Sequence, residues 1–383
     1  MTRQIYLDYM ATTPVDSRVV SVMRKYLDIE GEFGNPASNT HHFGLNARKA
    51  IDVARDQVAA LINALPEEIV WTSGSTEANN LALLGAMRFY QRRGKHLLTM
   101  ATEHKSVLDT CHYLERNGYV CTYLNPDGNG CLNLQELEDN IRPDTVLVSV
   151  MHVNNETGVV QDLARIADIV KARGALFHTD AAQSNGKLSI DVKKLPVDLL
   201  SLSSHKIYGP KGVGALYVRS KPQIRLEALI HGGGHERGMR SGTLATHQIA
   251  GMGQAFDIAI SEMKEDQWHA QRLTERLWTL LQETDVIWNG FGAARVPNCM
   301  NLCFPEMRGE SLILSAPSLA FSVGSACNSA TPKPSHVLTA MGISNRLADC
   351  SVRLSVGRFT TLNDVELAGS VLLNAYKKLK QLL

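Results

Sequence analysis

Leu199-Leu-Ser-Leu-Ser-Ser-His-Lys-Ile-Tyr-Gly-Pro-Lys-Gly-Val-Gly-Ala-Leu-Tyr-Val218 contains an apolar, hydroxyl-rich strand, a turn that carries Lys206, and the start of a second strand. A lysine at the end of a buried strand, among small residues, loses hydration, which favours its free-amine form. A free amine can form a Schiff base with an aldehyde cofactor and later carry a proton. Most lysines are solvated surface charges, so Lys206 becomes a candidate catalytic residue only through its neighbours in the fold.

Apolar runs alternate with helical stretches from about residue 47 to residue 260. Buried strands are predicted at 69–72, 96–99, 145–149, 175–178 and 199–202, with helices at 77–92 and 162–173. This alternation predicts an α/β fold with a largely parallel sheet covered on both faces. In such sheets ligands bind beyond the C-terminal ends of the strands.

The pattern changes after residue 260. A long charged helix is predicted over 261–282, and a smaller α+β region follows and ends in a helix from about Thr361, where Thr361 and Asp364 form a predicted capping box. We therefore predict a large α/β domain over residues 14–260. Residues 1–13 and 261–383 are predicted to form a small α+β domain, which carries a loop of small residues and proline at about 323–335.

Charge and composition argue against several classes of protein. The 383 residues include 39 Lys and Arg against 38 Asp and Glu, a formal net charge of +1. The chain therefore lacks the concentrated basic surface of a nucleic-acid-binding protein. It also lacks an apolar run of the roughly 18 residues that a membrane span needs. Seven cysteines without tight CxxC pairs do not resemble a secreted disulfide framework, so we expect a cytoplasmic protein that binds neither nucleic acid nor a membrane.

A hydroxyl-rich segment, Thr72-Ser-Gly-Ser-Thr-Glu-Ala-Asn-Asn80, follows the first of these strands and opens a helix. Backbone N–H groups and hydroxyls at a helix N-terminus form an anion site that suits a phosphate. An ordinary Ser/Thr N-cap is the alternative interpretation of the same residues.

Other polar side chains also follow predicted strands. Asp180, in Phe177-His-Thr-Asp-Ala-Ala-Gln-Ser184, needs a cationic partner if it is ionised, and a protonated pyridine nitrogen would serve. Gln183 can reach a neighbouring ring substituent, His104 can stack on a flat ring and shuttle protons, and Asn155 completes the strand-end pattern. The alternatives are an N-cap role for Asp180 and a structural, hydrogen-bonded role for His104. Together with Lys206, these side chains predict a pyridoxal phosphate pocket.

Cys327 lies in the predicted loop of small residues. A thiol there can act as a nucleophile if a base is near or the thiolate is favoured. The other cysteines are predicted to be packing residues: Cys111, Cys121, Cys131, Cys299, Cys303 and Cys350. His231 and His235 flank a triple glycine without further ligands, so no metal requirement is predicted.

Several longer motifs run through the chain: Tyr6-Leu-Asp-Tyr9, Gly34-Asn-Pro-Ala-Ser38, Met151-His-Val-Asn-Asn-Glu-Thr-Gly158, Ser204-His-Lys-Ile-Tyr-Gly-Pro-Lys-Gly212, Gly232-Gly-Gly-His-Glu-Arg-Gly-Met-Arg-Ser-Gly-Thr243 and Gly324-Ser-Ala-Cys327. In these motifs the chain resembles the cysteine desulfurases, in the class V aminotransferase branch of the fold-type-I pyridoxal phosphate enzymes. The resemblance extends from about residue 4 to residue 380. It implies a mainly parallel seven-stranded sheet flanked by helices, plus a smaller α+β domain. The Gly-Ser-Ala-Cys loop resembles that of the group feeding iron–sulfur cluster assembly.

The resemblance implies a role for each matching residue. Lys206 would form the Schiff base with pyridoxal 5'-phosphate, His104 would stack on the ring, Asp180 would pair with the pyridinium and Gln183 with the ring hydroxyl. The residues implied to hold the phosphate are Ser75, Thr76, Ser203, His205 and, across the interface of a homodimer, Thr243.

The substrate would be L-cysteine, with its carboxylate bound by Arg353 and assisted by Asn155, because a planar guanidinium suits a carboxylate. The implied reaction yields L-alanine and a persulfide on Cys327. That sulfur would pass to an acceptor protein, either an iron–sulfur scaffold or a thiolation carrier. Cys327 is also a candidate ligand of a transferred iron–sulfur cluster.

Two departures from the family pattern concern the acceptor. Family members dedicated to the scaffold grip it with a C-terminal segment that has no match here, since the sequence ends at Leu383. Their basic stretch after the lysine hairpin is reduced to Arg219-Ser-Lys-Pro-Gln-Ile-Arg225. The alternative functions are a selenocysteine or cysteine-sulfinate lyase or an aminotransferase on the same fold, which need Lys206 but not Cys327, and a non-catalytic regulatory protein.

Overall fold

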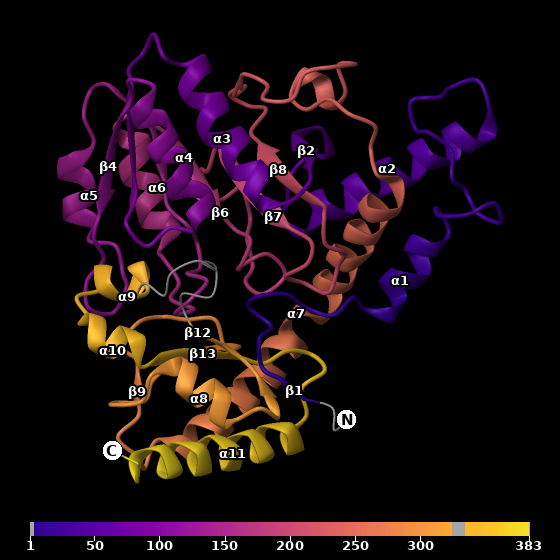
Figure 1. Ribbon diagram of the computed structural model, residues 1–383. Helices are drawn as coiled ribbons and strands as arrows, with labels where there is room; N and C mark the ends of the chain where they lie inside the picture. Colours follow the sequence, from indigo (N-terminus) through magenta and orange to yellow (C-terminus); the bar gives the residue numbers. More distant parts are fainter. Residues whose placement is uncertain (1–3, 324–333, 383) are drawn as a thin grey trace.

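The computed structural model describes residues 4–323 and 334–382. Figure 1 shows a large sheet with its helices in the upper part, and a smaller group of strands and helices from the last third of the chain below it. The helices of this structure are α1 (Ser17–Arg24), α2 (His42–Leu61), α3 (Ser75–Phe89), α4 (Lys105–Arg116), α5 (Leu134–Asn140), α6 (Leu163–Ala172), α7 (Thr246–Leu281), α8 (Gly309–Ser315), α9 (His336–Ala340), α10 (Asn345–Asp349) and α11 (Leu362–Lys380), with short 3₁₀ turns η1 (Pro66–Glu68) and η2 (Glu236–Gly238).

The large sheet has seven strands in the order β2-β8-β7-β6-β5-β3-β4. Its strands are β2 (Ile69–Thr72), β3 (His96–Met100), β4 (Val120–Leu124), β5 (Thr145–Ser149), β6 (Leu176–Asp180), β7 (Leu199–Ser203) and β8 (Gly214–Val218). The strands from β7 to β4 pair in parallel, whereas β8 is antiparallel to both β7 and β2. Two antiparallel pairings restore the direction, so β2 also ends at the edge where β7 ends. The predicted seven-stranded, mainly parallel sheet is confirmed.

Helices cover both faces of this sheet, as the continuous apolar strands require. One face packs Val70, Leu147 and Leu199 against α3 and α4. The opposite face packs Trp71, Val148 and Leu200 against α2, α6 and the first half of α7. Neighbouring residues of one strand thus enter different cores, which explains why each strand is apolar throughout.

The smaller part is built on a four-stranded antiparallel sheet in the order β12-β13-β10-β9. These strands are β9 (Ile287–Trp288), β10 (Cys299–Cys303), β12 (Ser322–Val323) and β13 (Ser351–Ser355). The N-terminal strand β1 (Ile5–Tyr6) pairs with β11 (Leu319–Ala320), and Leu7 belongs to the same core as the second half of α7 and α11. The capping box at Thr361 and Asp364 is present at the start of α11.

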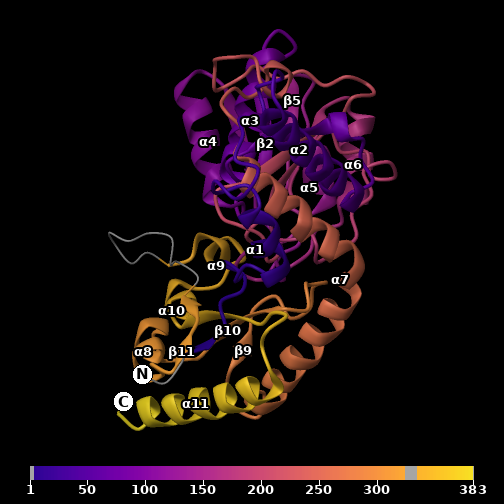
Figure 2. The same cartoon turned by 90° about the vertical axis from the view of Figure 1, so that its right-hand side faces the viewer.

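Helix α7 differs from its prediction. We expected a helix from residue 261, but α7 begins at Thr246 and runs to Leu281. Its first half is rich in small buried residues such as Gly251, Gly253 and Ala255, and it packs on α1 and α2. This first half lacks the charged face of the second half, so the sequence pattern groups it with the alternating strands and helices before residue 260. Figure 2 shows the helix running from the large sheet to the smaller part, so it passes through residue 260, and the division into two domains there stays a prediction.

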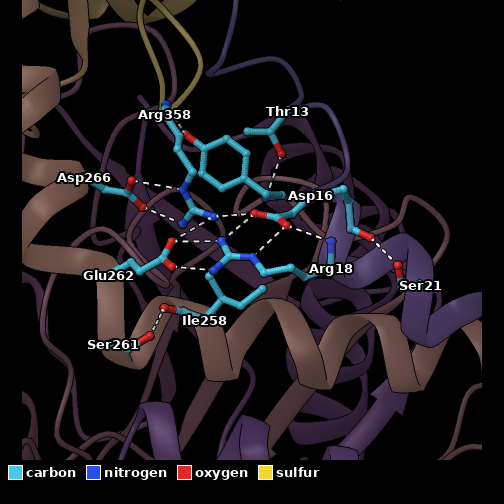
Figure 3. A network of polar contacts seen from close by, with 11 residues as sticks. Thr13, Asp16, Arg18, Ser21, Ile258, Ser261, Glu262, Asp266 and Arg358 are labelled. Carbon is cyan, nitrogen blue, oxygen red and sulfur yellow. Dashed lines mark hydrogen bonds and ion pairs between the residues drawn. The ribbon is translucent and has the colours of Figure 1, made fainter.

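An ion-pair network joins three segments at this helix (Figure 3). Arg358, which follows β13, pairs with Asp16 of the N-terminal segment at 2.8 Å and with Asp266 of α7 at 2.7 Å. Arg18 pairs with Asp16 and with Glu262 of the same helix. The network therefore fixes the smaller part against α1 and α7.

No helix in the described ranges is long and apolar enough to cross a membrane. The six described cysteines are free thiols, and four of them are buried: Cys111, Cys299, Cys303 and Cys350.

Candidate active site

The predicted site residues follow the C-terminal ends of strands that meet at one edge of the large sheet. The strands and the residues that follow or end them are β2 with Ser75 and Thr76, β3 with His104, β5 with Asn155, β6 with Asp180 and Gln183, and β7 with Ser203, His205 and Lys206. Because these ends lie side by side, the sheet brings together residues spread over about a third of the sequence.

A chain of hydrogen bonds connects Asp180 to His104. One oxygen of Asp180 accepts from the backbone N–H of Ala182 at 2.9 Å, and the other accepts from Nδ2 of Asn79 at 2.7 Å. Nδ2 of Asn79 also donates to Oγ of Ser106 at 2.8 Å, and Oγ of Ser106 lies 2.9 Å from Nδ1 of His104. These hydrogen bonds hold the carboxylate of Asp180 in one orientation. Asp180 is also buried, with only 4% of the residue exposed.

Asn79 was missed by the sequence analysis. It lies on the face of α3 that is turned to the sheet and is fully buried. A buried asparagine among apolar helix residues needs hydrogen-bond partners for its amide. An asparagine on the apolar face of a helix that begins at a candidate phosphate site is the sequence signal that could have identified Asn79.

His104 has the structural role that we considered as an alternative, because it is the N-cap of α4. Its Nδ1 accepts from the backbone N–H of Ser106 at 3.1 Å. Burial lowers the pKa of His104, and the positive charge of Lys206 acts in the same direction while Asp180 opposes it. The cap fixes the position of a neutral ring beside Asp180.

Glu103 is a second residue that the sequence analysis missed. Its carboxyl is fully buried and accepts from the backbone N–H of Met151 at 2.6 Å. Burial raises the pKa of Glu103 well above its usual range, and the negative charge of Asp180 adds to the effect. The raised pKa favours the neutral form of Glu103 next to His104.

Lys206 is held against the N-terminal segment of the chain. Its Nζ donates to the backbone carbonyls of Met10 at 2.8 Å and Ala11 at 2.6 Å. The turn itself is held by Thr13, whose Oγ1 accepts from the backbone N–H of Tyr208 at 2.7 Å. Tyr208 adopts the left-handed region with φ of 66°, a strained conformation for a tyrosine, so the turn depends on these contacts.

The candidate phosphate site lies where α3 begins. Its N-cap is Gly74, which makes no side-chain cap bond, so the predicted alternative of an ordinary Ser/Thr N-cap is not realised. Gly74 has φ of 153°, and a Cβ at this position would point into open space. Oγ of Ser203 is buried and has no hydrogen-bond partner among the described residues. A buried hydroxyl without a partner is costly, so it fits a ligand that supplies an acceptor.

Two further predicted phosphate residues differ in their surroundings. Nδ1 of His205 lies 3.0 Å from Oγ1 of Thr12, and burial lowers the pKa of His205 to about 4, with the charges of Lys206 and Lys211 acting in the same direction. Thr243 is exposed, and within the described chain it forms no hydrogen bond with the residues above.

Gln183 connects the site to the N-terminal segment. Its Nε2 donates to the carbonyl of Met10 at 2.9 Å, and its Oε1 accepts from Nζ of Lys187 at 3.1 Å. The structure therefore brings Gln183 and Lys206 to the same carbonyl. Met10 and Lys187 were not singled out from the sequence, because neither follows a predicted strand directly.

Arg353, in β13, faces the site from the smaller part. It donates through Nη1 to the carbonyl of Asn155 and through Nη2 to Asp8, each at 2.8 Å. Nε of Arg353 and Oδ1 of Asn155 are buried and have no partner among the described residues. A guanidinium with a spare donor beside a spare amide oxygen fits a small ligand that carries a carboxylate and a donor group.

Cys327 lies outside the described residues. The described chain on either side of it is attached to the site. Oγ of Ser322 donates to Asp8 at 2.7 Å, and Oγ of Ser335 bonds to Oε2 of Glu156 at 2.5 Å.

The arrangement fits a flat, cationic heterocycle with an aldehyde and a phosphate. Asp180 provides a fixed, buried negative charge for a ring nitrogen. Lys206 provides the amine, and the start of α3 with Ser203 provides donors for a phosphate.

Comparison with known proteins points in the same direction. The family model described as aminotransferase class-V matches residues 5–367. The cysteine desulfurase IscS of Klebsiella pneumoniae subsp. pneumoniae is 54% identical over 383 residues, which cover all of this chain and 95% of that protein. The cysteine desulfurase IscS of Colwellia psychrerythraea is 53% identical with the same coverage.

Solved structures agree with these relatives. A NifS-like protein superimposes with a TM-score of 0.90 at 35% identity, covering 98% of this chain and 99% of that chain. SspA in complex with cysteine superimposes with a TM-score of 0.84 at 39% identity, covering 93% of this chain and 99% of that one.

Proposed function

The chain belongs to the class V aminotransferase family, and from this premise we propose that it is a cysteine desulfurase that converts L-cysteine to L-alanine and passes the sulfur to Cys327. In this reaction the carbon–sulfur bond of cysteine breaks and a sulfur–sulfur bond to Cys327 forms. The β-carbon gains one proton, so that one thiol and cysteine become alanine and a persulfide. The observation that carries the proposal is the placement of Lys206 and the fixed Asp180 carboxylate at one edge of the sheet.

The cofactor that we propose is pyridoxal 5'-phosphate. Asp180 would hold the ring nitrogen, His104 would cover the ring, Gln183 would meet the ring hydroxyl, and Lys206 would bind the aldehyde. The phosphate would be held by Ser75, Thr76, Ser203 and His205, together with Thr243 from the second subunit of a homodimer. When bound, this cofactor supplies a ring that accepts electrons from the substrate carbon.

Lys206 is the residue that we propose to remove the proton from the α-carbon of cysteine. A neutral amine has two hydrogens, and the carbonyls of Met10 and Ala11 can accept both. The lone pair of the nitrogen can then take the substrate proton. His104, kept neutral by burial, covers the ring without adding a second positive charge.

Arg353 and Asn155 would bind the carboxylate and orient the α-carbon toward Lys206. The guanidinium already donates to Asp8, so a substrate carboxylate would share the cation or displace that aspartate. This exchange keeps the arginine paired whether or not substrate is present, because an unpaired buried charge is costly.

Cys327 would carry the sulfur to an acceptor protein, an iron–sulfur scaffold or a thiolation carrier. This part of the proposal rests on the Gly324-Ser-Ala-Cys327 motif and on the relatives. The reaction needs a reduced thiol at Cys327, so we propose the reducing cytoplasm as its compartment.

Absorbance and product assays test this function. The purified protein should be yellow and should release sulfide and alanine from L-cysteine. Lys206→Ala should abolish both products, and Cys327→Ala should abolish sulfur transfer while leaving the colour. Lys211→Ala is the matched control, because Lys211 is exposed in the same turn and should retain activity.

Two results would contradict the proposal. Colourless, inactive protein after addition of pyridoxal 5'-phosphate would exclude the cofactor. Unchanged sulfide release by Cys327→Ala would favour a lyase that does not use the thiol.

A further inference from the structure

A small cavity next to the Lys206 turn has no role in the proposed reaction. Its volume is about 40 Å³, and its walls come from the β6–β7 connection, the lysine turn, α7 and the chain around β10 and β13. The residues of its lining with polar side chains are Lys187, Lys206, Tyr208, Asp266, Gln267, Asn298 and Arg358. Two lysines therefore line one small cavity.

Hydrogen bonds connect the two lysines. Nζ of Lys187 donates to Oε1 of Gln183 at 3.1 Å, and Nε2 of the same amide donates to the carbonyl of Met10 at 2.9 Å. That carbonyl also accepts from Nζ of Lys206 at 2.8 Å. One amide and one carbonyl thus connect Lys187 to Lys206.

Lys187 has no carboxylate partner within the described part of the chain. Arg353 adds positive charge from β13, Cys299 of β10 is a buried thiol, and Asp266 of α7 is paired with Arg358. Burial lowers the pKa of Lys187 to about 7, and the charge of Lys206 acts in the same direction. A buried ammonium without a counterion is costly, and such groups concentrate at functional sites.

We propose that Lys187 is a positioning residue for Lys206, which acts by competing with it for one positive charge in this cavity. Electrostatic coupling between two sites is reciprocal, so a proton on Lys187 disfavours a proton on the nitrogen of Lys206. Lys187 thereby favours the neutral form of Lys206 that takes the substrate proton. This inference rests on the proposed function, in which Lys206 binds the cofactor.

Spectroscopic titration of the holoenzyme tests it. The visible absorbance of the bound cofactor reports protonation of the nitrogen of Lys206, and its midpoint can be measured between pH 6 and pH 10. Lys187→Met removes the charge that Lys187 carries below about pH 7, so it should raise the midpoint by up to about one pH unit, and most when the wild-type midpoint lies near or below pH 7. Lys187→Arg keeps the charge and should leave the midpoint in place or lower it. Lys194→Met is the control, since Lys194 is exposed and its change should have no effect.

The outcomes separate charge from packing. A midpoint that does not move in Lys187→Met, or that rises equally in Lys187→Met and Lys187→Arg, overturns the proposal. If Lys187→Met does not fold, Lys187→Gln keeps a donor for Gln183 without the charge and carries the same expectation. Colourless wild-type protein would refute the proposed function, whereas yellow wild-type protein with an unmoved midpoint in the neutral variants would refute only the role of Lys187.

Discussion

Arg353 and Arg358 lie five residues apart, and their surroundings differ in how completely each guanidinium is paired. Arg358 meets three carboxylates, those of Asp16, Glu262 and Asp266. Arg353 meets one carboxylate and one carbonyl, and its Nε has no partner among the described residues. The first arginine uses its donors to hold the fold together, and the second retains a donor for a ligand.

The carboxyl groups around the two arginines differ in their pKa values. Asp16 accepts hydrogen bonds from Arg18, which lower the pKa of Asp16 to about 2 together with a hydrogen bond from Arg358. Glu156 lies next to Asn155 on the Arg353 side, and burial raises the pKa of Glu156 to about 7 although Arg353 opposes the shift. The ion pairs around Arg358 stabilise the charged form of Asp16. On the Arg353 side the ionised form of Glu156 has too few partners to offset its burial, so its pKa lies near 7.

Of the two arginines, Arg353 should have the larger effect on activity when it is replaced. Arg353→Met removes the only side-chain cation that we assign to the substrate carboxylate, so kcat/KM should fall by about 100- to 1,000-fold, mainly through KM. Steady-state kinetics with L-cysteine measure the change, and the melting temperature shows whether the fold is retained. Arg346→Met is the control at an exposed arginine of α10. An unchanged KM would show that the spare donor is not a carboxylate site.

Replacement of Arg358 should mainly affect stability. Arg358→Met leaves Asp16 and Asp266 without a common cation, and breaking such a partly buried network should lower the free energy of unfolding by about 3 kcal/mol. Urea denaturation measures the loss. Arg142→Met is the matched control, because Arg142 and Asp144 form an exposed pair with 41% and 48% of their side chains accessible, and about 1 kcal/mol or less is expected. Equal losses in both variants would mean that the network stabilises the fold no more than the exposed Arg142–Asp144 pair does.

The sequence predicted the sheet better than it predicted the contacts within the site. Strand ends are recognisable because a buried apolar run stops at a polar residue, and this placed Asp180 and Lys206 correctly at the ends of β6 and β7. The partners of these residues come from distant segments, as Met10 does for Lys206 and Asn79 does for Asp180. Periodicity describes neighbours along one element and does not indicate which remote backbone carbonyl or amide will lie against it.

The two arginines show the same limit. Their motif, Ser351-Val-Arg-Leu-Ser-Val-Gly-Arg358, places both at the end of a predicted small domain. Only the resemblance favoured Arg353 as the substrate residue. The difference in pairing depends on Glu262 and Asp266 of α7 and on Asp16 of the N-terminal segment, and the pattern within each element does not show that they meet at Arg358.

Stability on the Arg353 side should fall as pH rises. The folded state raises the pKa of Glu156 from 4.5 to about 7, so its contribution is fully present below pH 4.5 and is lost as pH rises to about 7. Glu156→Gln should remove this fall, which makes the variant more stable than the wild type by roughly 2 kcal/mol at pH 8. Unfolding free energies measured from pH 4.5 to pH 8 check the prediction. A constant difference between the variant and the wild type across this range would contradict the raised pKa.

Stability on the Arg358 side should change with pH in the opposite direction and by less. The folded state lowers the pKa of Asp16 from 3.8 to about 2, so its contribution is present above pH 4 and is lost as pH falls toward 2. Asp16→Asn should cost about 1 kcal/mol above pH 4, because Arg18 is half exposed and asparagine keeps the N-cap of α1. The difference between variant and wild type should shrink as the solution is acidified, which urea denaturation between pH 5 and pH 3 can measure. A difference that instead grows on acidification would contradict the lowered pKa of Asp16.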